Sequence, residues 1–108
     1  MQNKKYLSLL GLARRAGKLS MGHDMSYEAV RKRKAKLIVF SSDISIRLIG
    51  EFERAKGDIP SLKICETIDE IHKALGYKAG VLTVNDENFA DRIKELINQE
   101  ENVYGDKD

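Results

Sequence analysis

The chain of 108 residues has the length of one domain, and a composition of 42% hydrophobic and 33% charged residues is typical of a packed globular core. Cys65 is its only cysteine, which excludes a disulfide framework and any site of several thiolates and is typical of a reducing compartment. The net charge of +2 conceals an asymmetry, because residues 1–54 hold 12 Lys/Arg against 5 Asp/Glu and residues 55–108 hold 7 against 12. Either one face is made for a polyanion, or the two halves intermix in space.

The first elements predicted along the chain are a helix and a short strand. Residues 4–16 have apolar side chains at helical spacing, and Gly17 ends the pattern. Arg14 and Arg15 interrupt this apolar stretch, so it is not a signal peptide, and no later run reaches membrane-spanning length. We therefore expect a cytoplasmic protein without a membrane partner. Residues 19–21 follow as a short strand.

The middle of the chain predicts two helices around a central strand. A helix from about residue 23 to 34 ends in a crowded basic turn, and the continuous apolar run 37–40 is typical of a buried central strand. Asp43 or Ser45 can cap the next helix, which ends near Gly57. Its predicted core-facing residues are Ile46, Ile49 and Phe52.

The second half continues the alternation. Residues 62–65 predict a short strand, and the capping-box spacing that begins at Thr67 predicts a helix ending at Gly76. Residues 81–84 predict another strand, and Asn85 or Asp86 caps a final helix with regular apolar spacing.

Beyond Gln99 the chain is polar and acidic. We predict a domain over residues 1–99 and a flexible acidic tail over residues 100–108. Its acidic residues are Glu100, Glu101, Asp106 and Asp108.

Helices and strands alternate, with a helix first and a helix last. This order predicts an α/β fold, a three-layer α/β/α sandwich with five helices and a four-stranded sheet that we expect to be mixed.

Three segments resemble a known family: LLGLARRAGKLSMG from residue 9, AKLIVFSSDIS from residue 35 and EIHKALGYKAGVLTVND from residue 70. They are similar to the YlxQ-like branch of the kink-turn RNA-binding ribosomal-protein superfamily. The resemblance covers almost the whole chain. It implies the same sandwich, a structured RNA ligand, and a link to ribosomes or translation.

The resemblance places one RNA contact at the start of the second helix. The family motif there is Gly-x-Asn-Glu-x-x-Lys, and Gly22 matches its glycine while His23 fills the variable position. Asp24, Met25 and Glu28 stand where the family has Asn, Glu and Lys. These departures remove a donor and replace a cation by an anion, so we expect weaker kink-turn binding than in archaeal relatives.

Two loops complete the site that the resemblance implies. In the loop of residues 76–80, Tyr77 is expected to stack on an unpaired base beside Lys78. In the turn after the central strand, Ser42 and Asp43 offer polar groups to ribose or base edges.

The densest positive cluster is the run of residues 31–34 followed by Lys36. We interpret it as a phosphate-binding surface, although cations also favour a helix C-terminus for electrostatic reasons alone. That alternative applies with more force to Arg14 and Arg15. We expect Lys18, Lys32, Lys36 and Lys78 to lie at one end of the sandwich and to face one phosphate track.

No catalytic, cofactor or metal site is predicted. His23, Asp24, His72 and Cys65 are the available ligands, and their spacing matches no metal motif. We expect Cys65 to be buried and His72 to lie on a helix surface. No nucleophile–base pair suggests an enzyme.

The prediction is therefore a monomer that binds structured RNA, with ribosomal proteins as further candidate partners. The alternative is a protein-interaction module of the same fold that has lost kink-turn binding.

Overall fold

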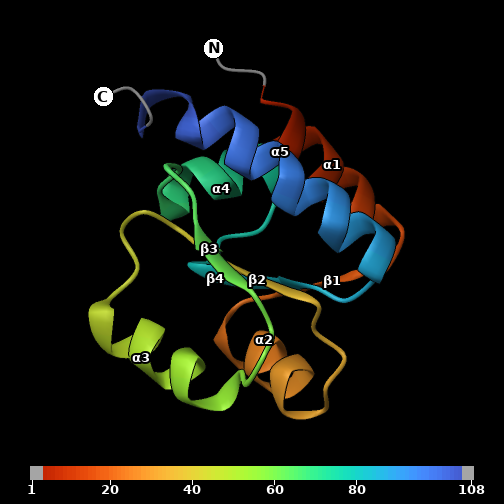
Figure 1. Cartoon of the computed structure of the whole chain (residues 1–108), viewed down its shortest axis with the longest axis vertical. Coiled ribbons are helices and arrows are strands. Elements are labelled where there is room, and N and C mark those ends of the chain that lie inside the picture. The colour runs from red at the N-terminus through yellow and green to blue at the C-terminus, as the bar shows by residue number, and fades with distance from the viewer. Residues whose placement is uncertain (1–3, 106–108) are drawn as a thin grey trace.

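The computed structural model describes residues 4–105, and in these residues five helices alternate with four strands (Figure 1). The helices are α1 (Lys5–Arg15), α2 (His23–Arg31), α3 (Ile46–Ala55), α4 (Ile68–Leu75) and α5 (Glu87–Gly105). The strands are β1 (Leu19–Met21), β2 (Leu37–Phe40), β3 (Ser61–Lys63) and β4 (Val81–Val84). Within residues 4–105, no helix is both long enough and apolar enough to cross a membrane.

The strands form one mixed sheet in the order β1-β4-β2-β3. β2 and β3 are parallel, whereas β4 is antiparallel to both β1 and β2. α1, α4 and α5 cover one face of the sheet, and α2 and α3 cover the other (Figure 1). The predicted three-layer α/β/α sandwich with a mixed sheet is confirmed.

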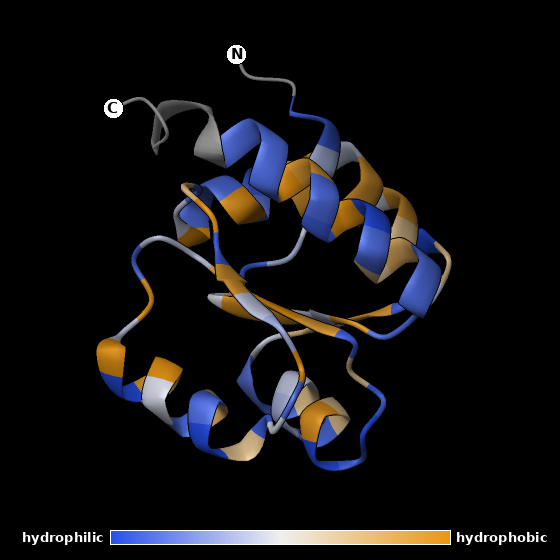
Figure 2. Cartoon of the chain, in the orientation of Figure 1, coloured by the Kyte–Doolittle hydropathy of each residue, from blue (hydrophilic) through white to orange (hydrophobic). Residues whose placement is uncertain are grey.

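Each face of the sheet has its own hydrophobic core. Tyr6, Leu10 and Ile93 belong to the cluster under α1, α4 and α5, and Val30 and Phe52 belong to the cluster under α2 and α3. Apolar residues accordingly concentrate in the strands and on the helix faces turned toward them (Figure 2). Both central strands are buried throughout, as the continuous apolar run in β2 predicted.

Local capping signals set the helix starts as predicted. The Ser45 hydroxyl accepts from the backbone N–H of Leu48, Thr67 forms a complete capping box with Glu70, and the Asp86 carboxylate accepts from the N–H of Phe89.

Helix α2 is shorter than predicted, because it ends at Arg31 and not at Lys34. Arg33 adopts a left-handed conformation with φ of 62°. The N–H of Lys34 then bonds to the carbonyl of Ala29, and the N–H of Arg33 bonds to that of Val30, which is a Schellman ending. Most of the basic run therefore lies beyond the end of the helix.

Two burial predictions are wrong. Ile46 is 86% exposed, because it occupies the first position of α3, before the helix turns its apolar face to the sheet. Cys65 is also exposed. β3 ends at Lys63, and the buried position after it belongs to Ile64.

Helix α5 continues past Gln99, where the acidic tail was expected to begin. Glu100 accepts hydrogen bonds from the backbone N–H groups of Lys5 and Tyr6, and the Glu101 carboxylate contacts the Lys4 ammonium and the Tyr6 hydroxyl. These anions meet the positive N-terminus of α1, which gives the last turns of α5 a partner that composition alone does not show. Residues 106–108 of the expected tail lie outside the described residues.

Candidate nucleic-acid interface

Three segments that are distant in the sequence meet where β4 begins. The N–H of Gly22 donates to the carbonyl of Val81 at 2.9 Å, and the N–H of Ser41 donates to the carbonyl of Gly80 at 2.9 Å. These bonds join the start of α2, the turn of residues 41–43 and the loop of residues 76–80. We call these three segments together the loop end.

Tyr77 lies directly against Gly22. A Cβ at position 22 would stand 3.8 Å from Cε1 of the ring and 3.9 Å from its hydroxyl, and φ of 92° at Gly22 disfavours any residue with a side chain. Tyr77 remains 46% exposed. The predicted juxtaposition of the α2 start and this loop is confirmed, and nearly half of the Tyr77 side chain is accessible.

Arg14 also contacts this loop and the end of α4. Its guanidinium donates to the carbonyl of Leu75 at 2.8 Å and lies 6.0 Å from the centre of the Tyr77 ring, a cation–π geometry. Sequence reasoning attributed Arg14 to the dipole of α1, and no spacing signal links it to Tyr77. Only the packing of α1 beside α4 brings the two side chains together.

The start of α2 combines backbone N–H donors with a histidine that lies between two carboxylates. No side chain caps the helix, so its first N–H groups point outward beside Asp24 and Met25, which are both exposed. His23 lies between carboxylates, with Nδ1 3.0 Å from Asp24 and Nε2 3.2 Å from Glu51. The hydrogen bond to Asp24 has the largest effect on the pKa of His23 and raises it. Burial lowers the pKa by less, and the hydrogen bond to Glu51 adds a further increase, so the pKa is raised overall.

The turn of residues 41–43 is also part of the internal structure. One carboxylate oxygen of Asp43 accepts from the Ser41 hydroxyl at 2.9 Å and from the N–H of Ile68 at 3.0 Å. Burial opposes the charge, but these hydrogen bonds lower the pKa of Asp43 overall. Asp43 thus ties the turn to the start of α4, while the residue itself stays exposed and Ser42 is half-buried.

The expectation that the four lysines lie at one end of the sandwich is wrong. The N–H of Asn85 donates to the carbonyl of Lys18, and the N–H of Lys36 donates to that of Val84. Both lysines therefore lie where β4 ends, whereas Lys78 precedes its start. The antiparallel pairing of β4 with β1 and β2 imposes this separation. We call Lys18, residues 31–34 and Lys36 together the basic end.

The charges of the two ends are partly paired. Lys32 lies 2.8 Å from Glu28 one turn earlier on α2, and this contact lowers the pKa of Glu28. Lys78 lies 3.9 Å from Asp69, with both side chains mostly exposed. A polar hollow of about 180 Å³ beside α2, lined by Ser20, Met25, Glu28, Lys32, Lys34 and Asn85, extends from the first turn of α2 to the basic end.

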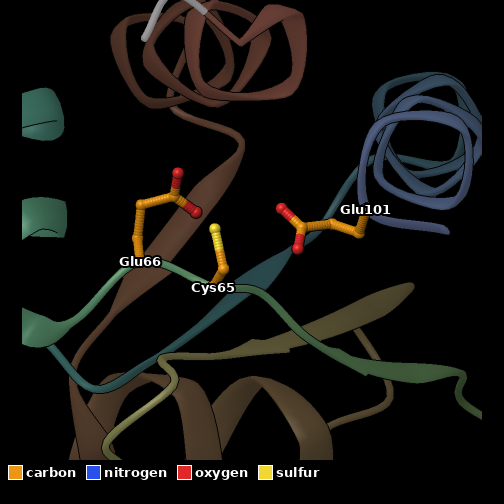
Figure 3. A group of neighbouring side chains, drawn as sticks. All are labelled: Cys65, Glu66 and Glu101. Carbon is orange, nitrogen blue, oxygen red and sulfur yellow. The ribbon is translucent and has the colours of Figure 1, made fainter. Parts of the chain in front are cut away.

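One group of side chains resembles a metal site but already encloses a cation. Cys65, Glu66 and Glu101 place their ligand atoms within 4.8 Å of one another (Figure 3). The Lys4 ammonium lies 3.2 Å from each of the two carboxylates and 2.7 Å from the Cys65 sulfur. Burial opposes its charge, but these hydrogen bonds raise the pKa of Lys4. The cluster therefore serves as an internal ion network between α1 and α5.

Comparisons with known proteins identify the family of the chain. Residues 4–56 match the model of the ribosomal protein L7Ae/L30e/S12e/Gadd45 family. A protein from Enterococcus faecium described as RNA-binding protein YlxQ is 30% identical over 96 residues, which span 87% of this chain and 92% of the relative. The chain belongs to this family, in its YlxQ-like branch.

Further relatives extend the match. A YlxQ protein from Bacillus subtilis is 28% identical, over 90% of this chain and 99% of its own length. A solved structure from Bacillus halodurans, of unknown function, has a TM-score of 0.82 at 30% identity and covers 89% of this chain and 99% of its own. The Giardia lamblia 15.5kD RNA binding protein has a TM-score of 0.70 at 16% identity over 94% and 92%, which shows the shared fold.

Proposed function

We propose that this protein binds structured RNA at the loop end, with Tyr77 stacking on an unpaired base. The observation on which the proposal rests is the contact of an exposed tyrosine ring with Gly22 at the start of an uncapped helix. A base of any type can stack on an aromatic face, and outward N–H groups can donate hydrogen bonds to a phosphate or to acceptors on a base edge. The relatives described as RNA-binding proteins support the same assignment.

The charges at the loop end favour an RNA other than a tightly bound kink-turn. Asp24 and Glu28 place carboxylates where the family motif has an amide and a cation, and Glu28 already pairs with Lys32. Repulsion between these carboxylates and phosphates lowers affinity. We propose that recognition depends on the unpaired base at Tyr77, with phosphate contacts from Arg14 and from the basic end.

The test is a fluorescence anisotropy titration with three RNAs: a model kink-turn, a hairpin with one bulged base, and a continuous duplex of the same length. We expect the kink-turn and the bulged hairpin to bind more tightly than the duplex. Photocrosslinking of the bulged hairpin followed by mass spectrometry should identify Tyr77 as the crosslinked residue. Equal affinity for the duplex, together with crosslinks confined to the basic end, would show that only charge is recognised.

The family also includes ribosomal proteins, so we propose ribosomal RNA as the ligand class and translation in the cytoplasm as the setting. Sequencing of RNA crosslinked to the protein in cells tests this proposal. Enrichment of messenger or regulatory RNA without ribosomal RNA would contradict it.

A further inference from the structure

Helix α1 has a second exposed face that does not contribute to the loop end. Arg14 faces Tyr77, whereas Leu12 lies two positions earlier, a rotation of about 200° around the helix. The side of α1 that presents Leu12 therefore points away from the RNA surface. It runs beside α5, which lies against α1 along the same face of the sheet (Figure 1).

Between these two helices lies a hollow of about 610 Å³, which we call the α1–α5 groove. Its apolar residues are Leu9, Leu12 and Leu96, and its cations are Lys5, Arg15 and Arg92. Leu96 is buried and Leu9 is half-buried, but Leu12 in the middle of α1 is 47% exposed. An apolar side chain docked here would cover Leu12 and rest on the other two leucines.

Both ends of the α1–α5 groove carry positive charge, from Lys5 at one end and Arg15 at the other. α1 contains no acidic residue, and within the described residues the side chains of Lys5 and Arg15 form no salt bridge. Arg92 pairs with Glu95 at 3.1 Å, and the Glu100 carboxylate is already bonded to backbone N–H groups of α1. Lys5 and Arg15 are ten residues apart, so two available cations stand about 15 Å apart along the helix.

We propose that the α1–α5 groove binds an amphipathic helix of a protein partner, with leucine-type side chains on one face and acidic residues flanking them. Apolar residues between two cations complement this pattern, and a separation of about 15 Å suits a helix of two to three turns. An RNA would pair with the cations but leave Leu12 uncovered. Because the groove and Tyr77 lie on opposite sides of α1, the partner and an RNA can bind together.

The test uses the isotope-labelled full chain and a synthetic three-turn helical peptide with leucines at i, i+3, i+4 and i+7 and glutamates elsewhere. We expect saturable NMR shifts along α1 and α5 that leave the loop end unchanged. Leu12→Glu removes the apolar contact of a half-exposed leucine and adds a charge that repels the glutamates of the peptide, so it should weaken binding about tenfold. Arg15→Glu should also weaken peptide binding, because it replaces a cation that attracts the glutamates by an anion that repels them. Leu12 and Arg15 are exposed, so both variants should fold.

Lys73→Glu, an exposed change on α4, is the matched control and should leave the affinity unchanged. A peptide with lysines in place of the glutamates should not bind. The proposal is overturned if the acidic peptide shows no saturable binding or if the lysine peptide binds equally well. It is also overturned if the NMR shifts caused by the acidic peptide fall at the loop end. An RNA oligonucleotide that displaces the peptide from the groove would overturn it as well.

Discussion

The loop end and the basic end adjoin opposite ends of the same helix, yet they are built in different ways. Three chain segments meet at the loop end, where Tyr77 packs against Gly22 and under Arg14. The basic end draws most of its charge from the single run of residues 31–36, and Glu28 partly neutralises it. In the proposed function, the loop end would recognise the shape of the RNA and the basic end its phosphate charge.

The largest expected effect on RNA binding comes from Tyr77→Ala. Loss of a base stack costs roughly 1–3 kcal/mol, about 5- to 150-fold in affinity for the bulged hairpin. The slope of log K against log salt should not change, because no phosphate contact is lost. Tyr77→Phe keeps the ring and is the control. If the Ala and Phe variants bind equally well, no base stacks at this position.

Truncation after Gln99 should lower the stability of the fold without changing the loop end or the basic end. It removes the Glu100 carboxylate from the first N–H groups of α1, and it leaves the Lys4 ammonium and the Tyr6 hydroxyl without their contact to Glu101. A loss of ~1–3 kcal/mol corresponds to a decrease in Tm of at least about 4 °C in thermal circular dichroism. RNA affinity well below Tm should match that of the full chain. An unchanged Tm would restore the flexible tail predicted from composition.

The double change Asp24→Asn with Glu28→Lys should make the loop end a better kink-turn binder. It converts two carboxylates of the proposed RNA site into an amide and a cation and frees Lys32 from its pair. We expect about tenfold tighter binding to a model kink-turn at low salt. The control is Asp91→Asn with Glu95→Lys, which makes the same charge change at the same spacing on α5. Equal gains in both variants would point to net charge alone, and weaker binding would contradict the proposed alignment.

The two lysines of the basic end should differ in their salt dependence. Lys36→Ala is expected to flatten the slope of log K against log salt by ~0.7, the value of one phosphate contact. Lys32→Ala should flatten it less, because Glu28 already neutralises part of its charge. Equal slopes for wild type and both variants would remove the basic end from the RNA surface.

The smallest effect concerns pH and is confined to the loop end. The pKa of His23 is raised in the folded state, so its ion pairs stabilise the fold fully below its unfolded pKa of about 6.5. This contribution is lost as the pH rises through the folded pKa. Urea unfolding should therefore show a stability difference between wild type and His23→Gln that shrinks from pH 5.5 to pH 8.5. A difference independent of pH would mean that the ring acts only through packing against Tyr27 and Phe52.

Much of the fold could be predicted because its signals are local. The capping box at Thr67, the continuous apolar run of β2 and the glycine that ends α4 each act within a few residues, so the order of elements could be derived from the sequence. The error at Ile46 has a local reason: its spacing suits a core position, but it is the first residue of α3 and stands before the helix turns its apolar face to the sheet. Contacts between distant segments also act where local signals are silent, since the Glu100 carboxylate meets the start of α1 just past Gln99.

For the candidate site, the sequence by itself determined which residue types are present: an aromatic loop residue, a glycine at the start of α2, and a basic run. Only the tertiary structure decided which of them meet. Antiparallel pairing of β4 with its neighbours places Tyr77 beside Gly22 and places Lys18 and Lys36 at the far end of the strands. The packing of α1 beside α4 brings Arg14 to the Tyr77 ring. Strand direction and helix packing are non-local properties, and no spacing along a single chain encodes them directly.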